Sequence, residues 1–156
     1  MNTQSFSTNK FLLWVLLIIS FIFLRSSYGK LVGGAFVQNL GKTLEKFASE
    51  NPYPWFKGFL QGTAMPNSEI FGILTMYGEV FAGLAILIAS FYYLANQKNS
   101  SLLNLLLLLG LLVGAFLNGI FWLAAGWTSP STDGLNLLMF VLQVIGIIYL
   151  VRGKLS

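Results

Sequence analysis

The sequence predicts an all-α membrane protein, a four-transmembrane-helix bundle with one or two interfacial helices in its first loop. Hydrophobic residues make up 56% of the 156 residues and charged residues only 9%, whereas a soluble domain carries about 25% charge. The mean hydropathy is +0.74. Between positions 70 and 151 the charges are Glu79, Lys98 and Asp133. Despite the net charge of +4, this distribution excludes a soluble domain, a disordered chain and a nucleic-acid-binding protein.

The missing residue types restrict the chemistry. The chain contains no Cys and no His. Disulfides, thiolate nucleophiles and Cys-ligated iron–sulfur clusters are therefore excluded, as is imidazole ligation of haem, copper or zinc. We expect no metal site and no covalently bound cofactor. Redox chemistry here would need a bound organic cofactor or a partner chain.

Four apolar segments are long enough to cross a membrane, because a spanning helix needs roughly 20 residues for about 30 Å of hydrocarbon. The first could be mistaken for a secretory signal peptide. Only Lys10 precedes it as a basic residue and no Ala-x-Ala site follows it, which favours a retained span. The predicted spans of this single domain (residues 1–156) are residues 11–29, 70–95, 102–127 and 135–151.

The distribution of basic residues bears on the orientation. An even number of spans places both termini on one side, and the total number of basic residues is almost equal on the two sides. The short loop at 96–101 carries Lys98, whereas the loop at 128–133 carries no basic residue. By the positive-inside rule, we expect the termini to lie inside.

The first loop, residues 30–68, is too apolar to be a plain linker. Phe36, Leu40, Leu44 and Phe47 recur at helical spacing. This period predicts an amphipathic helix that lies along the membrane interface.

The segment Asn51-Pro52-Tyr53-Pro54-Trp55 follows that helix. Its two prolines predict an extended turn, and its aromatic side chains suit the headgroup layer. A second short helix is expected over residues 55–61. The next span then begins with Asn67 or Ser68 as its N-cap and Glu69 in its first turn.

Polar residues inside spans are costly and mark candidate functional sites. Glu79 is the strongest candidate. Its neighbours on one helix face include Gly72, Thr75, Ala82 and Gly83, and such a small-residue face packs against other helices. We therefore expect Glu79 to point into the bundle.

Asn118 in the third span and Gln143 in the fourth lie at a depth similar to that of Glu79. Counted from the side of the first loop, each is roughly 12–14 Å below the surface at 1.5 Å per residue. Arg25 lies about 7 Å deep on the same side, and Lys30 begins the loop. The sequence thus predicts one polar layer, open toward the first loop, of Arg25, Lys30, Glu79, Asn118 and Gln143.

Three stretches have the form of family motifs. Residues 23–31, FLRSSYGKL, are similar to FLxxGxxKL, and residues 51–60 contain an NPYPWF segment. Residues 66–83 contain PNxxxF followed by Gly-Glu and a further Gly. On these motifs the chain, over residues 11–150, resembles the DoxX superfamily. The likeness is strongest to the DoxD-like branch, the small-subunit type of thiosulfate:quinone oxidoreductase.

This resemblance implies a four-helix membrane protein linked to sulfur or quinone redox chemistry and working with other subunits. Lys30 and Glu79 match polar positions of the family motif. A quinone or another hydrophobic cofactor would bind at a partner interface. The implied location is a prokaryotic plasma (inner) membrane or another energy-transducing membrane.

Two functions remain open. In the first, the chain is a small subunit in quinone-coupled oxidation of thiosulfate, not catalytic alone, with Glu79 as a candidate proton relay or quinone contact. In the alternative, it is a non-catalytic accessory or assembly subunit of a respiratory or photosynthetic complex. It would then pack against helices, lipids or pigments, and Glu79 would only form a buried ion pair. Membrane lipids and other membrane subunits are the expected partners in both, and nucleic acid in neither.

Overall fold

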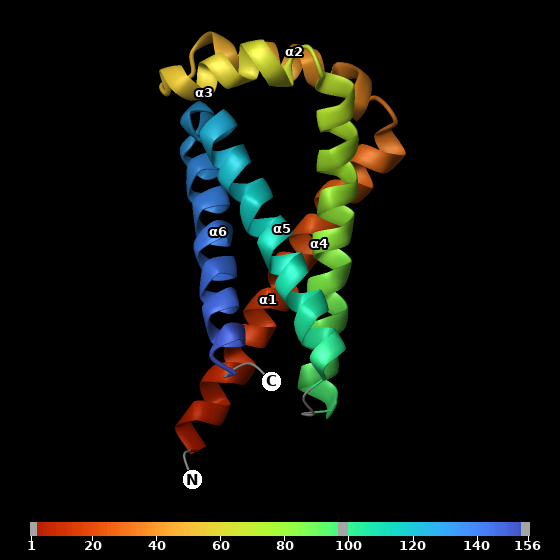
Figure 1. Cartoon of the computed structure of the whole chain (residues 1–156), viewed down its shortest axis with the longest axis vertical. Coiled ribbons are helices and arrows are strands. Elements are labelled where there is room, and N and C mark those ends of the chain that lie inside the picture. Colours follow the sequence, from red (N-terminus) through yellow and green to blue (C-terminus); the bar gives the residue numbers. More distant parts are fainter. Residues whose placement is uncertain (1–2, 97–99, 154–156) are drawn as a thin grey trace.

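Four long helices run between the two ends of the structure, a computed structural model that describes residues 3–96 and 100–153 (Figure 1). All four are long and apolar enough to cross a membrane. The predicted all-α four-helix membrane bundle is thereby confirmed, and the chain is an integral, multi-pass membrane protein. The long helices are α1 (Thr3–Gly33), α4 (Ser68–Asn96), α5 (Ser101–Ala125) and α6 (Pro130–Val151).

Three short helical segments cap one end of the bundle (Figure 1). They are α2 (Phe36–Ser49), α3 (Pro54–Phe59) and the π-helical turn η1 (Leu60–Ala64). The predicted amphipathic helix is confirmed as α2, because Leu40, Leu44 and Ala48 are buried on one of its faces. The second short helix begins one residue earlier than expected, at Pro54, and continues into the π turn, where the Met65 N–H donates to the Leu60 carbonyl.

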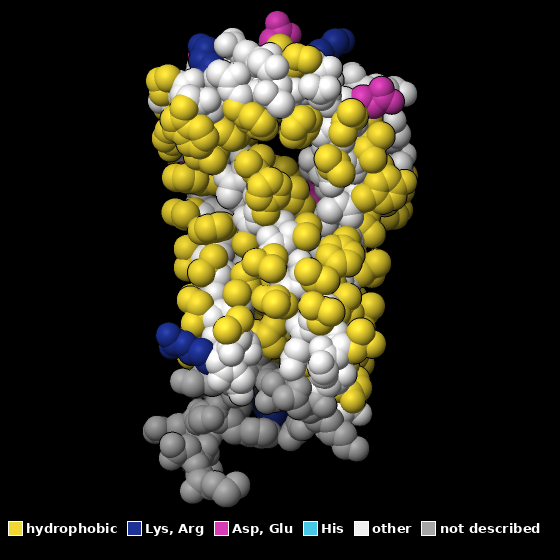
Figure 2. All heavy atoms as spheres, in the orientation of Figure 1, with side chains coloured by type: hydrophobic (Ala, Val, Ile, Leu, Met, Phe, Trp, Pro, Cys, Tyr) yellow, Lys and Arg dark blue, Asp and Glu magenta, His cyan; other side chains and the backbone are white. Residues whose placement is uncertain are grey.

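On the face that Figure 2 shows, hydrophobic side chains cover the surface between the two ends, and the charged side chains lie close to the ends, apart from an acidic side chain seen inside the hollow beneath the cap. This distribution fits a hydrocarbon belt bounded by two headgroup layers. The start of α1 and the end of α6 lie at the end opposite the cap (Figure 1). The termini-inside orientation stays a prediction, since Lys98, on which it depends, lies outside the described residues.

The first span extends further toward the cap than predicted. The expected end was residue 29, but α1 continues to Gly33 and stops where Gly34 takes a positive φ of 64°, a backbone conformation that glycine adopts at little cost. The basic residue of its last turn is Lys30, a favourable place for a cation. Lys30 therefore projects from a helix, where the sequence had placed it at the start of a loop.

The fourth span begins earlier than predicted. Residues 128–133 were expected to form a loop, but α6 starts at Pro130. Ser129 caps it by accepting a hydrogen bond from the Thr132 N–H, and a proline at the first helical position has a φ suited to the helix. The prediction was wrong because it relied on the polar residues of this stretch, which are typical of a loop, and did not use Ser129 and Pro130, which are typical of a helix start. Asp133 also accepts a hydrogen bond from Trp122 Nε1 at 2.6 Å, which fastens α6 to α5.

Glycines bring the long helices close together. A Cβ on Gly83 of α4 would lie 2.8 Å from Leu24 of α1, and a Cβ on Gly110 of α5 would lie 2.8 Å from the Ala85 Cβ of α4. Such contacts are typical of small-residue interfaces between spans. They fix α1 and α5 against α4.

Candidate functional site

An ion pair joins α1 to α4 within the bundle. The Lys30 ammonium donates to Glu79 Oε1 and to the hydroxyl of Ser26, one turn earlier on α1, at 3.2 Å. The side chain of Glu79 is 2% exposed and that of Lys30 is 19% exposed. Two charges held this far from water stabilise each other, and removal of either strands its partner.

The surroundings of the pair are aromatic on the cap side. The Lys30 ammonium lies 5.0 Å from the ring centre of Phe36 in α2 and 5.5 Å from that of Phe121 in α5. Ring faces attract a cation at these distances. The second carboxylate oxygen of Glu79, Oε2, is buried and has no hydrogen-bond partner. Both charged groups thus retain unused hydrogen-bonding capacity.

The other predicted polar residues form a separate pair. The Asn118 amide of α5 donates to Gln143 Oε1 of α6 at 2.9 Å, and both side chains are buried. A Cβ on Gly114 would collide with the Gln143 amide and lie 3.1 Å from Phe23. Gly114 therefore makes room for this hydrogen bond, which ties α5 to α6.

The structure divides the predicted polar layer. Gly78, beside Glu79, lies against Leu117, which precedes Asn118, so the two polar groups are at a similar level. Glu79 nevertheless faces α1, whereas Asn118 faces α6. The Arg25 side chain is exposed and forms no ion pair or hydrogen bond with the described residues, so the structure does not bring it to the others.

The segment that contains Asn51, Pro52, Tyr53, Pro54 and Trp55 supports the cap. The Asn51 amide donates to the backbone carbonyls of Leu123 and Ala124 at 3.0 and 3.4 Å, and its Oδ1 accepts from the Tyr53 N–H at 3.0 Å. Pro54 is the first residue of α3, and Trp55 is 66% exposed. None of the five lines the cavity described below.

Asn51→Ala is expected to lower the free energy of unfolding by about 1–3 kcal/mol, because buried carbonyls and an N–H would lose their partner. Detergent-induced unfolding followed by tryptophan fluorescence measures this change. Asn67→Ala is the matched control, since the Asn67 amide makes one exposed bond to the Thr63 carbonyl. Equal stability of the two variants would show that the Asn51 bonds do not hold the cap.

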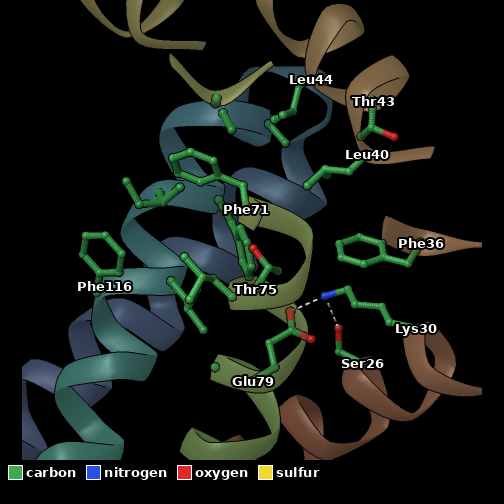
Figure 3. A pocket seen from close by; sticks show the side chains of 18 of the residues that line it. Ser26, Lys30, Phe36, Leu40, Thr43, Leu44, Phe71, Thr75, Glu79 and Phe116 are labelled. Carbon is green, nitrogen blue, oxygen red and sulfur yellow. Dashed lines mark hydrogen bonds and ion pairs between the residues drawn. The ribbon is translucent and has the colours of Figure 1, made fainter. Parts of the chain in front are cut away.

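A large apolar cavity lies between the cap and the ion pair. Its volume is about 1110 Å³, slightly above the range of about 300–1,000 Å³ for drug-sized sites. Lys30, Thr75 and Glu79 form part of its wall, and the Thr75 hydroxyl points into it one turn above Glu79 (Figure 3). Figure 2 shows the hollow beneath the cap. Its roof consists of side chains of α2, α3 and η1, among them Leu40, Leu44, Phe47, Phe59 and Leu60.

The sequence did not indicate this cavity. The helix α2 was predicted to lie along the membrane interface, and no contact was predicted for its apolar face; Phe36, Leu40 and Leu44 of that face line the cavity (Figure 3). Thr75 was noted only as a small residue near Glu79. Two sequence patterns could have indicated the cavity: the apolar face of α2 and the small-residue face of α4. Because both belong to one chain, the two faces could have been expected to enclose a space between them.

The arrangement places a cation and a carboxylate, with the Thr75 hydroxyl one turn from the carboxylate, in the wall of a largely apolar chamber. A buried carboxylate beside a charged partner in a cavity is a candidate functional group. The ammonium can donate to an oxygen of a ligand, and the carboxylate can accept or hold a proton. None of the family models, curated proteins and solved structures compared with the chain gives a match.

Proposed function

We propose that this chain is a small membrane subunit that binds a quinone in the cavity under the cap, with the quinone ring beside Lys30 and Glu79. The observation that carries the proposal is the Lys30–Glu79 ion pair in the wall of a large apolar chamber. A site that only stabilised the fold would have no need of the chamber. Apolar pockets with a few convergent polar groups are typical of sites for hydrophobic ligands.

The residues of the wall fit a quinone ring. An ammonium has three N–H donors, of which Glu79 and Ser26 receive two, so one remains for a carbonyl oxygen. The hydroxyl of Thr75 also points into the chamber (Figure 3). Aromatic side chains around Lys30 provide flat surfaces for a ring.

Glu79 is suited to hold a proton at the edge of this site. Its Oε2 atom is buried without a partner, and its Oε1 atom contacts the ammonium that would hold the carbonyl. A quinone accepts electrons and protons when it is reduced, so a carboxylate at its edge serves as a general acid or base. This is the proton-relay role expected for Glu79.

The electron donor belongs to another subunit. The 156 residues contain no Cys or His, so the chain cannot hold an iron–sulfur cluster or a haem through thiolate or imidazole. The resemblance to the DoxD-like branch supports thiosulfate, or a related small sulfur anion, as the source of electrons. Lys42, Lys46 and Lys57 on the cap carry positive charge that attracts such an anion.

The test is equilibrium binding of decyl-benzoquinone to the purified chain in nanodiscs. We expect saturable binding, because the head has hydrogen-bond partners in the chamber. Decylbenzene, which has the same tail without carbonyl groups, should only partition into the lipid. Equal, non-saturable uptake of the two compounds would contradict the proposal and leave the ion pair with a structural role alone, as in an accessory subunit.

A further inference from the structure

We infer that the ligand of this cavity enters sideways from the bilayer, through an opening between α4 and α5, and that its hydrocarbon tail stays in this opening while its head lies at Lys30. The inference rests on the proposed function for the head and adds the route and the position of the tail. It also restricts the ligand to molecules that carry an apolar tail.

The first observation is that the cavity wall continues onto the outer surface of the bundle. Several residues that line the cavity are at the same time exposed on the membrane-spanning helices. Leu74 is 63% exposed and Phe116 is 67% exposed. The lining residues with exposed side chains on α4 and α5 are Ile73, Leu74, Tyr77, Phe81, Leu112 and Phe116.

The packing of the helices explains why the opening lies there. Gly110 of α5 lies against Ala85 and Ile86 of α4, which closes the bundle away from the cap. Toward the cap, α5 is held to α6 by the Trp122–Asp133 hydrogen bond. There α4 packs instead against α2, since a Cβ on Gly72 would lie 3.2 Å from Val37. The two helices therefore diverge under the cap (Figure 1).

The roof is more closed toward the water than the side wall is toward lipid: of the lining residues that α2, α3 and η1 contribute, Thr43 alone is exposed. Leu40, Leu44 and Leu60 line the cavity from the cap and are buried. The charged residues of α2, Lys42, Glu45 and Lys46, lie on its exposed face. A ligand that came through the cap would have to displace this packed apolar layer, whereas the side opening meets lipid directly.

The chemistry of the wall identifies the part of the ligand that fills the opening. The residues at the rim of the opening have aliphatic or aromatic side chains. A hydrocarbon tail of the ligand that lies between them exchanges its contacts with lipid for similar contacts with the protein. Two polar side chains of the wall nearer the cap are bonded within their own helices: Thr43 donates to the Asn39 carbonyl, and Asn136 donates to the Thr132 carbonyl. Lys30, Glu79 and the neighbouring Thr75 are the polar residues placed to hold the head.

Two photoreactive quinones test the inference in phosphatidylcholine vesicles. One carries a diazirine on the ring, the other on the terminal carbon of a decyl tail, and labelled residues are identified by mass spectrometry. We expect the ring probe to label residues near Lys30 and Glu79 and the tail probe to label Leu74, Tyr77 or Phe116. Excess decyl-benzoquinone should suppress both labels.

The outcomes separate this inference from the proposed function. If the ring probe labels no cavity residue, or the competitor has no effect, the proposed quinone site is wrong. If the ring probe labels the cavity but the tail probe labels Leu40, Leu44 or Phe47 of α2, the site stands and the side opening is wrong.

A bulky residue at the rim gives a kinetic test that does not depend on labelling. Leu74→Trp is expected to slow the association of decyl-benzoquinone severalfold and to leave that of tail-less benzoquinone unchanged. Leu84→Trp is the matched control, because Leu84 is an exposed leucine of α4 that does not line the cavity. Equal association rates in the two variants would overturn the inference.

Discussion

Lys30→Met is expected to lower the free energy of unfolding by about 3–5 kcal/mol, because it leaves the Glu79 carboxylate buried without its cation. Methionine is similar to lysine in length and has an adaptable apolar side chain, so it leaves little empty space. The loss of stability then measures mainly the cost of the unpaired Glu79 carboxylate. Unfolding in mixed detergent and dodecyl sulfate micelles, followed by tryptophan fluorescence, gives the change in free energy.

Two further variants decide whether the ion pair causes this loss. Arg25→Met removes a charge from the same helix at an exposed position and should change the stability little. The double variant Lys30→Met/Glu79→Met should recover most of the lost stability, because apolar replacement of a whole buried pair is often neutral. A double variant as unstable as Lys30→Met alone would show that the loss has another origin.

Gly114→Ala is expected to destabilise the protein by about 1–3 kcal/mol, the usual cost of overpacking a tight core. The added methyl group would occupy the position of the Gln143 amide and break its hydrogen bond with Asn118. Thermal unfolding in detergent measures the loss.

The same substitution elsewhere on α5 provides the control. A Cβ on Gly119 would lie 3.7 Å from Phe140, an ordinary contact distance, so Gly119→Ala should leave the stability unchanged or raise it slightly through helix propensity. If the two alanine variants melt at the same temperature, the close approach at Gly114 does not matter to stability.

The number and type of the main helices could be predicted because length and apolarity determine spanning segments. The amphipathic period at Phe36 and Leu40 likewise identified α2. The ends of helices were less predictable, since they depend on single capping contacts. At Ser129 the hydroxyl caps α6, whereas the sequence pattern predicts a loop there.

Glu79 and Lys30 could be singled out from the sequence, but the division of the predicted polar layer into two separate pairs could not. Glu79 and Lys30 stand out because charges within or beside spans are costly. Their partner choice depends on how each helix is rotated about its axis, and successive side chains on a helix differ by about 100°. This is why Glu79 meets Lys30 on α1 while Asn118, at a similar level, meets Gln143 on α6.

The cavity could not be predicted from one sequence. It exists because α4 and α5 are in close contact at Gly110, whereas under the cap α4 packs against α2 and α5 is bonded to α6. These angles follow from many side-chain contacts and leave no local pattern in the sequence. The apolar face of α2 could contact lipid or cover a cavity, and only the three-dimensional structure distinguishes the two arrangements.

The affinity of decyl-benzoquinone for the Lys30→Met/Glu79→Met variant, relative to the native chain, tests the central claim most directly. Hydrogen bonds to charged groups contribute about 1.5–3 kcal/mol, so loss of the pair should weaken binding about 10- to 100-fold in a variant that still folds. An unchanged dissociation constant in the folded double variant would contradict the claim that the head of the ligand binds at this pair.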